Sequence, residues 1–296
     1  MARILAVGIA TLDLINEVAT YPREDAEVRA LSHTVRRGGN ATNTLVVLSQ
    51  LDHACDWAGV WVDEPDAGIL RADLDRYAVG TSYCRRVTQG KIPTSYITCS
   101  RATASRTIVH YRDLPEFDFG SFLEIPLETF DWVHFEGRNV AETLRMMEHL
   151  RRQCPGLPVS LEVEKPREGI ERLFPYANLL LFSRLFADHC GYSPEAMLQM
   201  IRKRIPHADI VCTLSALGAV GLGRSGELLF STAYPPGKLV DTIGAGDTFN
   251  AAMIDAALRG ESLATSLECA CRLAGAKCGQ AGFYGLGRTR MSGGDD

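Results

Sequence analysis

The chain has 296 residues, of which 46 % are apolar and 23 % charged, as in an ordinary folded globular protein. Its formal charge is −5 at pH 7 and its basic residues are scattered, which argues against a nucleic-acid partner or an anionic membrane. No stretch approaches the ~20 apolar residues of a membrane span. The nine cysteines include no Cys-x-x-Cys pair, so we expect a cytoplasmic protein without a metal site of its own.

Short apolar runs alternate along the chain with amphipathic segments, the pattern of strands and crossover helices in a parallel sheet. Strands are predicted at residues 4–9, 55–60, 132–136, 159–163, 179–182 and 210–214. Helices are predicted at residues 41–51, 66–77, 141–152, 194–204, 247–258 and 263–278. The continuous apolar runs among the strands suit a sheet that is covered on both faces. The sequence therefore predicts an α/β fold with a mostly parallel central sheet.

Two segments break this rhythm. Residues 27–37 alternate loosely with many polar positions, and residues 94–111 contain two short strands joined by a polar stretch. Both are typical of half-exposed antiparallel strands. We predict that they form a small antiparallel lid within a single domain of residues 1–291, which closes over a ligand or pairs with its copy in a second subunit. Residues 292–296 are predicted to be a polar tail.

The strongest chemical signal is a glycine-rich turn within residues 240–250 that leads into an alanine-rich helical stretch. Small residues at Gly244, Ala245 and Gly246 would let backbone N–H groups converge on an anion at the start of this helix. Asp247, in the same turn, could accept the proton of a hydroxyl that attacks phosphorus. The alternative is a plain glycine turn in which Asp247 caps the helix.

Two further positions suit a polyol ligand. Asn40 and Asn43 follow Gly39 at the start of a predicted helix, and residues three apart share a helix face. Their carboxamides offer both donors and acceptors to sugar hydroxyls, although simple capping by Asn40 is the alternative. Asp13 lies just beyond the first predicted strand, where ligands of open α/β sheets bind; an ordinary turn aspartate is the alternative.

One motif matches a dinucleotide-binding pattern but lies in the wrong structural context. Residues 221–226 fit the pattern Gly-x-Gly-x-x-Gly, but a strand-like run at 227–231 follows them instead of a helix. A hairpin turn is therefore predicted there, not a dinucleotide site. Since the sequence contains no P-loop pattern, phosphate binding must depend on the loop at Gly244.

Taken together, the Gly-Gly-Asn segment at 38–40 and the Asp-Thr-x-Gly-Ala-Gly-Asp segment at 241–247 closely resemble the two signatures of the ribokinase-like (PfkB-type) sugar kinases. The resemblance covers about residues 3–287 and implies a three-layer sandwich, a small β lid and ATP-dependent phosphorylation. Further stretches narrow it to a subgroup that phosphorylates the 1-hydroxyl of fructose; these are residues 21–25, 37–43, 136–139, 162–168 and 277–279. Another sugar or a nucleoside as acceptor, and a catalytically silent sugar-binding protein, stay open as alternatives.

The resemblance also implies roles for matching residues. Asp247 would be the catalytic base, and the N–H groups of residues 244–247 would stabilise the transferred phosphoryl group. The sugar would be held by Asp13, Gly39, Asn40 and Asn43, with Asp25 entering from the second subunit of a homodimer clasped by its lids. The nucleotide would be contacted by Arg106, Ser215, Ala216, Leu217, Gly218, Cys271 and Cys278.

The sequence departs from the family pattern in two places. The Asn-x-x-Glu that commonly assists magnesium is replaced by Ser-Arg-Leu-Phe at residues 183–186. We therefore expect Mg²⁺ to arrive with ATP and to keep several waters. Residues 215–218 lack the acidic run usual in the animal members of the subgroup, a change that bears on nucleotide affinity. A requirement for K⁺ stays open.

Overall fold

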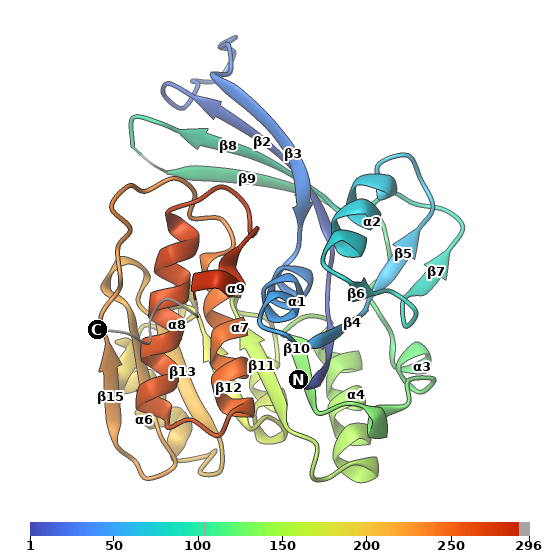
Figure 1. Ribbon diagram of the computed structural model, residues 1–296, viewed down its shortest axis with the longest axis vertical. Helices are drawn as coiled ribbons and strands as arrows, with labels where there is room; N and C mark the ends of the chain where they lie inside the picture. The colour runs from blue at the N-terminus through green and yellow to red at the C-terminus, as the bar shows by residue number, and fades with distance from the viewer. Residues whose placement is uncertain (104, 290–296) are drawn as a thin grey trace.

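A nine-stranded sheet forms the centre of the computed structural model, which describes residues 1–103 and 105–289 (Figure 1). In spatial order its strands are β15 (Leu228–Ser231), β14 (Ala219–Leu222), β13 (Asp209–Thr213), β12 (Leu179–Phe182), β11 (Val159–Val163), β10 (Trp132–Glu136), β1 (Arg3–Val7), β4 (Ala54–Ala58) and β6 (Val79–Gly80). The strands from β13 to β6 run parallel, and β14 and β15 add an antiparallel edge. The predicted α/β fold with a mostly parallel sheet is confirmed.

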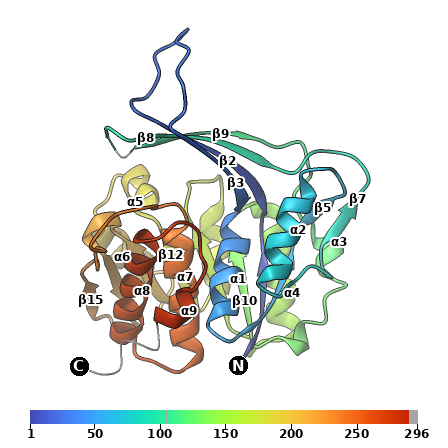
Figure 2. The same ribbon diagram turned by 45° about the horizontal axis from the view of Figure 1, so that its top comes forward.

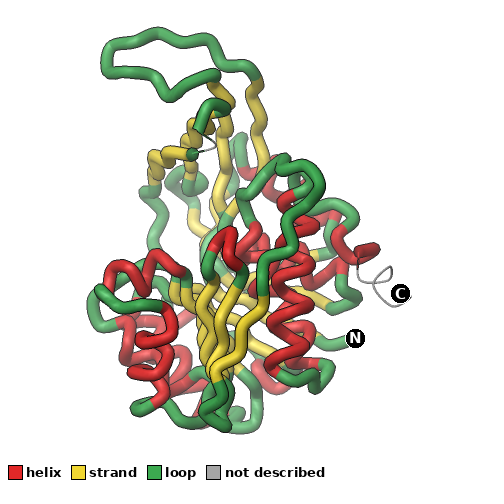
Figure 3. Tube along the Cα trace, turned by 90° about the vertical axis from the view of Figure 1, so that its left-hand side faces the viewer, coloured by secondary structure: helices red, strands yellow, loops and turns green. Residues whose placement is uncertain are grey.

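Helices cover both faces of this sheet, which gives the three layers visible in Figure 3. The helices are α1 (Asn40–Gln50), α2 (Ala67–Arg76), α3 (Phe119–Phe122), α4 (Val140–Gln153), α5 (Arg184–Cys190), α6 (Pro194–Arg202), α7 (Ala245–Leu258), α8 (Leu263–Cys278) and α9 (Leu286–Thr289). Short 3-10 turns lie at Leu127–Thr129, Ile170–Tyr176 and Ser215–Leu217. In the described part of the chain, no helix combines the length and apolar character needed to cross a membrane.

Successive side chains of a strand point to opposite faces, so each central strand supplies two hydrophobic cores. In β1, Ile4 and Ala6 pack into the core under α1, α7 and α8. Leu5 and Val7 pack into the other core, against α4 and α6. This double burial explains the uninterrupted apolar runs in the sequence. The parallel pairing brings the carboxyl ends of these strands to one edge of the sheet.

Most predicted elements are present, with ends that differ by one or two residues. The strand predicted at residues 55–60 is instead two strands, because the chain leaves the main sheet at Gly59. There β5 (Val60–Val62) pairs with β7 (Arg85–Val87) in a separate two-stranded sheet. The hairpin predicted around residues 221–226 is confirmed, since β14 and β15 pair antiparallel.

A four-stranded lid arches over the carboxyl edge of the main sheet (Figure 1). Its strands lie in the order β3 (Ser32–Gly38), β2 (Thr11–Val18), β8 (Thr94–Ser100) and β9 (Arg106–Tyr111). The prediction was wrong in three respects: β3 begins only at Ser32, β2 was missed, and the lid is not wholly antiparallel because β2 and β8 run parallel. β2 was missed because its polar residues follow the first strand without an intervening helical or loop pattern.

The loop that joins β2 to β3 extends beyond the lid, as the dark blue segment of Figure 2 shows. The predicted tail at residues 292–296 lies outside the described residues.

Candidate active site

A cavity of about 510 Å³ lies between the lid and the carboxyl ends of the main strands. The residues of the sequence-predicted site that line it come from both layers: Asp13, Gly39, Asn40, Asn43, Arg106, Gly244, Gly246 and Asp247. The fold thus brings together side chains that are up to about 230 residues apart in the chain. Ala245 lies between two of the lining residues and begins α7.

The loop before α7 has the geometry expected of an anion site. Gly244 is the N-cap of α7 with φ +84°, a left-handed conformation that favours glycine. A Cβ atom at Gly244 would lie 2.3 Å from the ring of Phe283, so the position also has no room for a side chain. The first N–H groups of a helix have no partner within it and carry partial positive charge. Their place beside the cavity suits a phosphoryl group.

Asp247 does not cap the helix; it lies in the first turn of α7, and its buried carboxylate accepts a hydrogen bond of 2.6 Å from Asn43 Nδ2. The orientation of the Asn43 amide is fixed in turn, because Arg37 Nη1 donates to Asn43 Oδ1 over 2.7 Å. Arg37 is itself anchored, since its Nε donates to Asp73 over 2.6 Å. A chain of contacts from α2 through β3 and α1 therefore positions the carboxylate.

Burial and neighbouring carboxylates change the acidity of Asp247. Burial raises the pKa of Asp247 to about 7, and the neighbouring charges of Glu164 and Glu136 add to this, while the Asn43 hydrogen bond opposes it. Burial also raises the pKa of Glu162 well above its usual range, and the charge of Asp247 reinforces that shift. A carboxyl group with a pKa near neutrality is suited to accept a proton at physiological pH.

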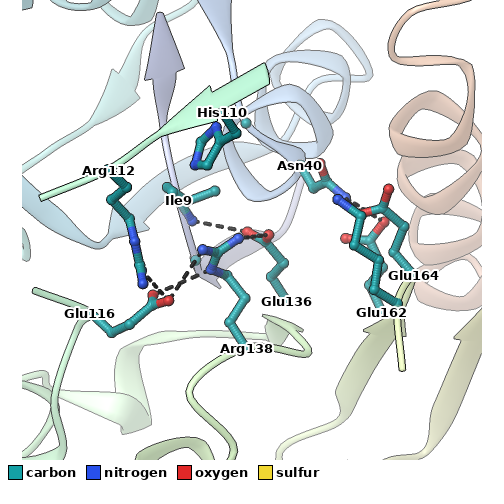
Figure 4. A network of polar contacts seen from close by, with 12 residues as sticks. Ile9, Asn40, His110, Arg112, Glu116, Glu136, Arg138, Glu162 and Glu164 are labelled. Carbon is teal, nitrogen blue, oxygen red and sulfur yellow. Dashed lines mark hydrogen bonds and ion pairs between the residues drawn. The ribbon is translucent and has the colours of Figure 1, made fainter. Parts of the chain in front are cut away.

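Asn40, the other asparagine of the motif, contacts two carboxylates of the cavity. Its Nδ2 donates to Glu162 Oε1 over 3.1 Å and to Glu164 Oε2 over 3.2 Å (Figure 4). The other oxygen of Glu162, Oε2, is buried and has no hydrogen-bond partner within the described chain. The structure therefore places Asn40 at the cavity wall with its amide facing acidic residues, and Asn40 does not cap α1, because the N-cap position belongs to Gly39.

Asp13 lies within β2, on the face of the lid that looks into the cavity, and not in a turn after the first strand. Thr11 Oγ1 donates to Asp13 Oδ1 over 2.8 Å. Burial raises the pKa of Asp13, although its contacts with Thr11 and Ser95 oppose the shift. The pairing register continues this inner face from Asp13 to Ser95 and then to His110.

A network of ion pairs closes the end of the cavity away from α7 (Figure 4). Arg138 Nη1 contacts Glu136 Oε1 at 3.0 Å, and its Nη2 contacts Glu116 Oε1 at 3.1 Å. Arg112 also pairs with Glu116. His110 from the lid faces this network, and burial together with the charges of Arg138 and Arg112 lowers the pKa of His110. These groups form a polar wall with donors for the hydroxyl groups of a ligand.

Arg106 begins β9 and reaches across to the loop before α7. Its Nη1 donates to Thr242 Oγ1 over 3.2 Å. The guanidinium group therefore lies next to the anion-binding turn, where it is suited to contact phosphate oxygens.

The remaining predicted residues do not line the cavity. Asp25 is exposed in the loop between β2 and β3 and has φ +60°. Ser215, Ala216 and Leu217 form a 3-10 turn that ends at Gly218. Cys271 Sγ donates to the backbone oxygen of Ser231 over 3.8 Å, and a Cβ atom at Gly218 would lie 2.0 Å from the same oxygen. Cys278 lies farther along α8, where its carbonyl accepts from Val240 N over 2.8 Å. Of these residues, Cys271 and Cys278 lie on α8, and the backbone of Cys278 contacts the segment that leads to Gly244.

Three glutamates that line the cavity were not predicted as site residues. Glu136 ends β10, Glu162 lies near the end of β11, and Glu164 follows it. All three are charged residues at the carboxyl end of a buried parallel strand, which is the place where α/β proteins bind ligands. That signal was present in the sequence. His110 of the lid, which lines the cavity, had no comparable signal, because the lid register decides which face it occupies. Arg112, just after β9, had none either.

Comparison with known proteins decides the family. Residues 1–286 match the pattern of the pfkB family carbohydrate kinases. The chain belongs to this family. The kinase is 39 % identical to ketohexokinase of Mus musculus over 293 residues, which cover 96 % of this chain and 98 % of that protein. It is 24 % identical to the fructosamine kinase FrlD of Bacillus subtilis, over 96 % of this chain and 94 % of that one.

The fold of the kinase is also that of solved structures. Ribokinase from Cryptococcus neoformans in complex with ADP superposes with a TM-score of 0.82 at 18 % identity, covering 98 % of this chain and 99 % of that one. This confirms the predicted ribokinase-like architecture. The expected carbohydrate kinase with ketohexokinase-like sequence is likewise confirmed.

Proposed function

We propose that the kinase transfers the γ-phosphoryl group of ATP to the 1-hydroxyl of D-fructose, with Asp247 as the base. The observation that carries this proposal is the position of Asp247, whose buried carboxylate lies in the first turn of α7 beside the anion-binding loop and within the cavity. The 39 % identity to ketohexokinase supports fructose as the acceptor.

The proposed step follows from these positions. Asp247 accepts the proton of the attacking hydroxyl as its oxygen forms a bond to the γ-phosphorus, and the bond to the β-phosphate oxygen of departing ADP breaks. The N–H groups of Gly244, Ala245 and Gly246 stabilise the charge on the transferred group, and Arg106 contacts the phosphates. The lid excludes water, which limits hydrolysis of ATP.

In this proposal the acceptor lies between the lid and the carboxyl edge of the sheet. Asp13 on β2 and the Asn40 and Asn43 amides on α1 contact its hydroxyl groups, and Gly39 allows the backbone to approach it. The charged wall around Arg138 bounds the far end of the sugar. The adenine would lie along residues 215–218, Cys271 and Cys278, where Cys271 and a side chain at Gly218 would both meet the backbone oxygen of Ser231.

Magnesium would enter bound to ATP. Within residues 1–103 and 105–289 no group of three or more His, Cys, Asp or Glu side chains could hold a metal ion. Glu162 and Glu164 nevertheless fit Mg²⁺, because the buried Oε2 of Glu162 lacks a partner in the described chain and carboxylate oxygens are the ligands that Mg²⁺ prefers. These two carboxylates would hold the ion, which would neutralise charge on the phosphates.

We also propose a homodimer formed through the outer face of the lid. The pairing register places Val35, Leu14, Tyr96 and Val109 side by side across all four strands, opposite to the residues that face the cavity. Three of them, Val35, Tyr96 and Val109, are exposed. An apolar row of this kind suits a second copy of the lid, and such a clasp would bring Asp25 near the partner's cavity.

An acceptor panel tests this proposal. ADP release from MgATP is measured with fructose, other ketohexoses, ribose and adenosine, and the product is identified by phosphorus NMR. We expect the highest kcat/KM with fructose and phosphate on its 1-hydroxyl. Asp247→Asn should lower kcat by roughly 10²–10⁴, the usual effect of losing a general base. Asp188→Asn, at an exposed carboxylate of α5, is the control and should keep full activity.

Other outcomes separate the alternatives. Turnover that is greater with ribose or adenosine would assign a different acceptor to the same site. Sugar binding without turnover of any acceptor would indicate a catalytically silent sugar-binding protein. A normal kcat in the Asp247→Asn variant would remove Asp247 from the role of base.

A further inference from the structure

Lys277, on α8, has a fully buried ammonium group outside the acceptor cavity. Its Nζ donates to the backbone oxygen of Asp241 and to Asp241 Oδ2, each over 3.0 Å, and to the backbone oxygen of Gln280 over 3.4 Å. An ammonium group has three donors, and each of them has an oxygen acceptor here. A buried charge is costly unless it is paired in this way. The surroundings of Lys277 Nζ are those of a bound monovalent cation: oxygen atoms of the backbone and one carboxylate.

The carboxylate of Asp241, which binds Lys277, also contacts the backbone of the loop before α7. Its Oδ1 accepts from Ile243 N over 2.9 Å, and its Oδ2 also accepts from Arg36 Nη1 over 2.8 Å. Although burial by itself raises the pKa of Asp241, the contacts with Arg36 and Lys277 lower it to about 2. Asp241 therefore stays ionised at any working pH, and it fixes the backbone immediately before Gly244.

Further contacts connect the end of α8 to the segment that leads to Gly244. The carbonyl of Cys278 accepts from Val240 N over 2.8 Å and from Asp241 N over 3.2 Å. Lys277 Nζ lies 5.5 Å from the centre of the Phe283 ring, and that ring occupies the space where Gly244 would carry a side chain. The end of α8 thus supports the turn whose N–H groups face the cavity. The charges of Lys277 and Arg36 exceed that of Asp241, so a net positive charge lies beside the turn, and this charge favours binding of a phosphoryl group.

We propose that the ammonium group of Lys277 serves as a built-in monovalent cation that positions the phosphoryl-binding loop, so that the kinase needs no added K⁺. Lys277 is a positioning residue, since it contacts Asp241 and not the reacting atoms. The inference rests on the proposed role of residues 244–246 in binding the transferred group.

Kinetics in buffers whose only added cation is tetramethylammonium test this inference. The wild-type kcat should change less than about twofold when 100 mM K⁺ or NH₄⁺ replaces tetramethylammonium, an ion too large for the position. Lys277→Ala should lower kcat by ~10- to 100-fold, because misplaced N–H groups stabilise the transition state less, while the KM for MgATP changes little. The cavity left in Lys277→Ala should admit NH₄⁺, which restores kcat several-fold.

Lys277→Met fills the same space without charge, so it should lose kcat and gain nothing from NH₄⁺. Lys203→Ala, at an exposed lysine, is the control. The proposal is overturned if the wild type requires K⁺, if Lys277→Met keeps kcat, or if NH₄⁺ fails to restore Lys277→Ala. Thermal unfolding supplies a readout that does not need an acceptor: NH₄⁺ should raise the Tm of Lys277→Ala and leave the wild type and Lys277→Met unchanged.

These readouts separate the two proposals. If the wild type turns over no acceptor, the proposed function fails, and the specific effect of NH₄⁺ on the Tm of Lys277→Ala still decides the role of the lysine. If the wild type is active but depends on K⁺, the proposed function stands and the role of Lys277 is refuted.

Discussion

Asp247 illustrates how strongly a single side chain depends on its neighbours. A carboxylate at the start of a helix ordinarily ionises easily, because the helix dipole favours negative charge. Here burial and the charges of Glu164 and Glu136 outweigh that effect and raise the pKa of Asp247 to about 7. Only the ionised form can accept a proton, so kcat/KM should rise with pH through an acid limb near 7.

Asn43 offers a direct test of this balance, because its hydrogen bond to Asp247 lowers the pKa of that carboxyl group. Asn43→Ala removes the bond, which raises the pKa and moves the acid limb of kcat/KM to higher pH by about one unit. The measurement is a pH profile with the best acceptor. Asn16→Ala, at an exposed asparagine on the lid, should leave the profile unchanged. A limb that stays in place or moves to lower pH would contradict the assignment.

At the scale of elements, the junction between β3 and α1 positions the asparagines of the proposed acceptor site. Gly39 has φ +101° and ψ +128°, a conformation open essentially to glycine alone. A Cβ atom there would lie 2.3 Å from the backbone oxygen of Ile9. The tight turn lets the lid strand pass directly into the helix that carries Asn40 and Asn43.

Gly39→Ala should therefore reduce stability by ~1–3 kcal/mol, the usual cost of such backbone strain, and raise the KM for the acceptor. Thermal unfolding and steady-state kinetics measure the two effects. Gly68→Ala is the matched control, because Gly68 lies in α2 with ordinary φ and a Cβ atom there would meet nothing within 4 Å. It should be neutral or stabilising by about 0.5–1 kcal/mol. Equal effects of both substitutions would show that the backbone conformation of Gly39 has no special role in stability or acceptor binding.

At the scale of the whole molecule, the buried carboxylates of the cavity lower the stability of the folded state as pH rises. Burial raises the pKa of Glu162 well above its usual range, and the nearby Asp247 adds to the shift. A raised pKa means that the folded state holds its proton more tightly than the unfolded state does. The contribution of Glu162 to the free energy of unfolding is therefore fully present below the ordinary carboxyl pKa, and it is lost as pH rises towards the raised value.

Glu162→Gln should remove this loss. We expect its Tm to exceed that of the wild type by roughly 3–6 °C at pH 8, and to differ little at pH 5. Thermal unfolding at the two pH values measures the effect, with Glu124→Gln at an exposed glutamate as the control. A lower Tm at pH 8, or an equal gain at both values, would show that repulsion in the cavity does not limit stability.

The proposed dimer is a second property of the whole molecule. Val109→Glu places a charge at the β9 end of the apolar row on the outer face of the lid, where it would face a second copy. Sedimentation velocity should then show a monomer in place of the wild-type dimer. Leu123→Asp, at an exposed leucine just after α3, should not alter the state. A monomeric wild type at micromolar concentration would exclude the lid interface.

The sequence alone determined the features that are encoded locally. Apolar runs and amphipathic segments predicted the parallel sheet and its helices, since periodicity depends on neighbours in the chain. The glycine-rich turn predicted an anion-binding helix start with an acidic residue beside it, because both the turn and the helix belong to one short segment. The resemblance to a kinase family rested on two such segments, and comparison confirmed it.

Only the tertiary structure decided what surrounds Asp247. Glu136 and Glu162 come from different strands and meet Asp247 because of the order of strands in the sheet, which no local pattern contains. The parallel pairing of β2 with β8 likewise fixed which lid residues face the cavity. The contact between Lys277 and Asp241 joins the end of one helix to the loop before another. Charges act through space, so these pKa values and ion pairs exist only once distant segments have packed together.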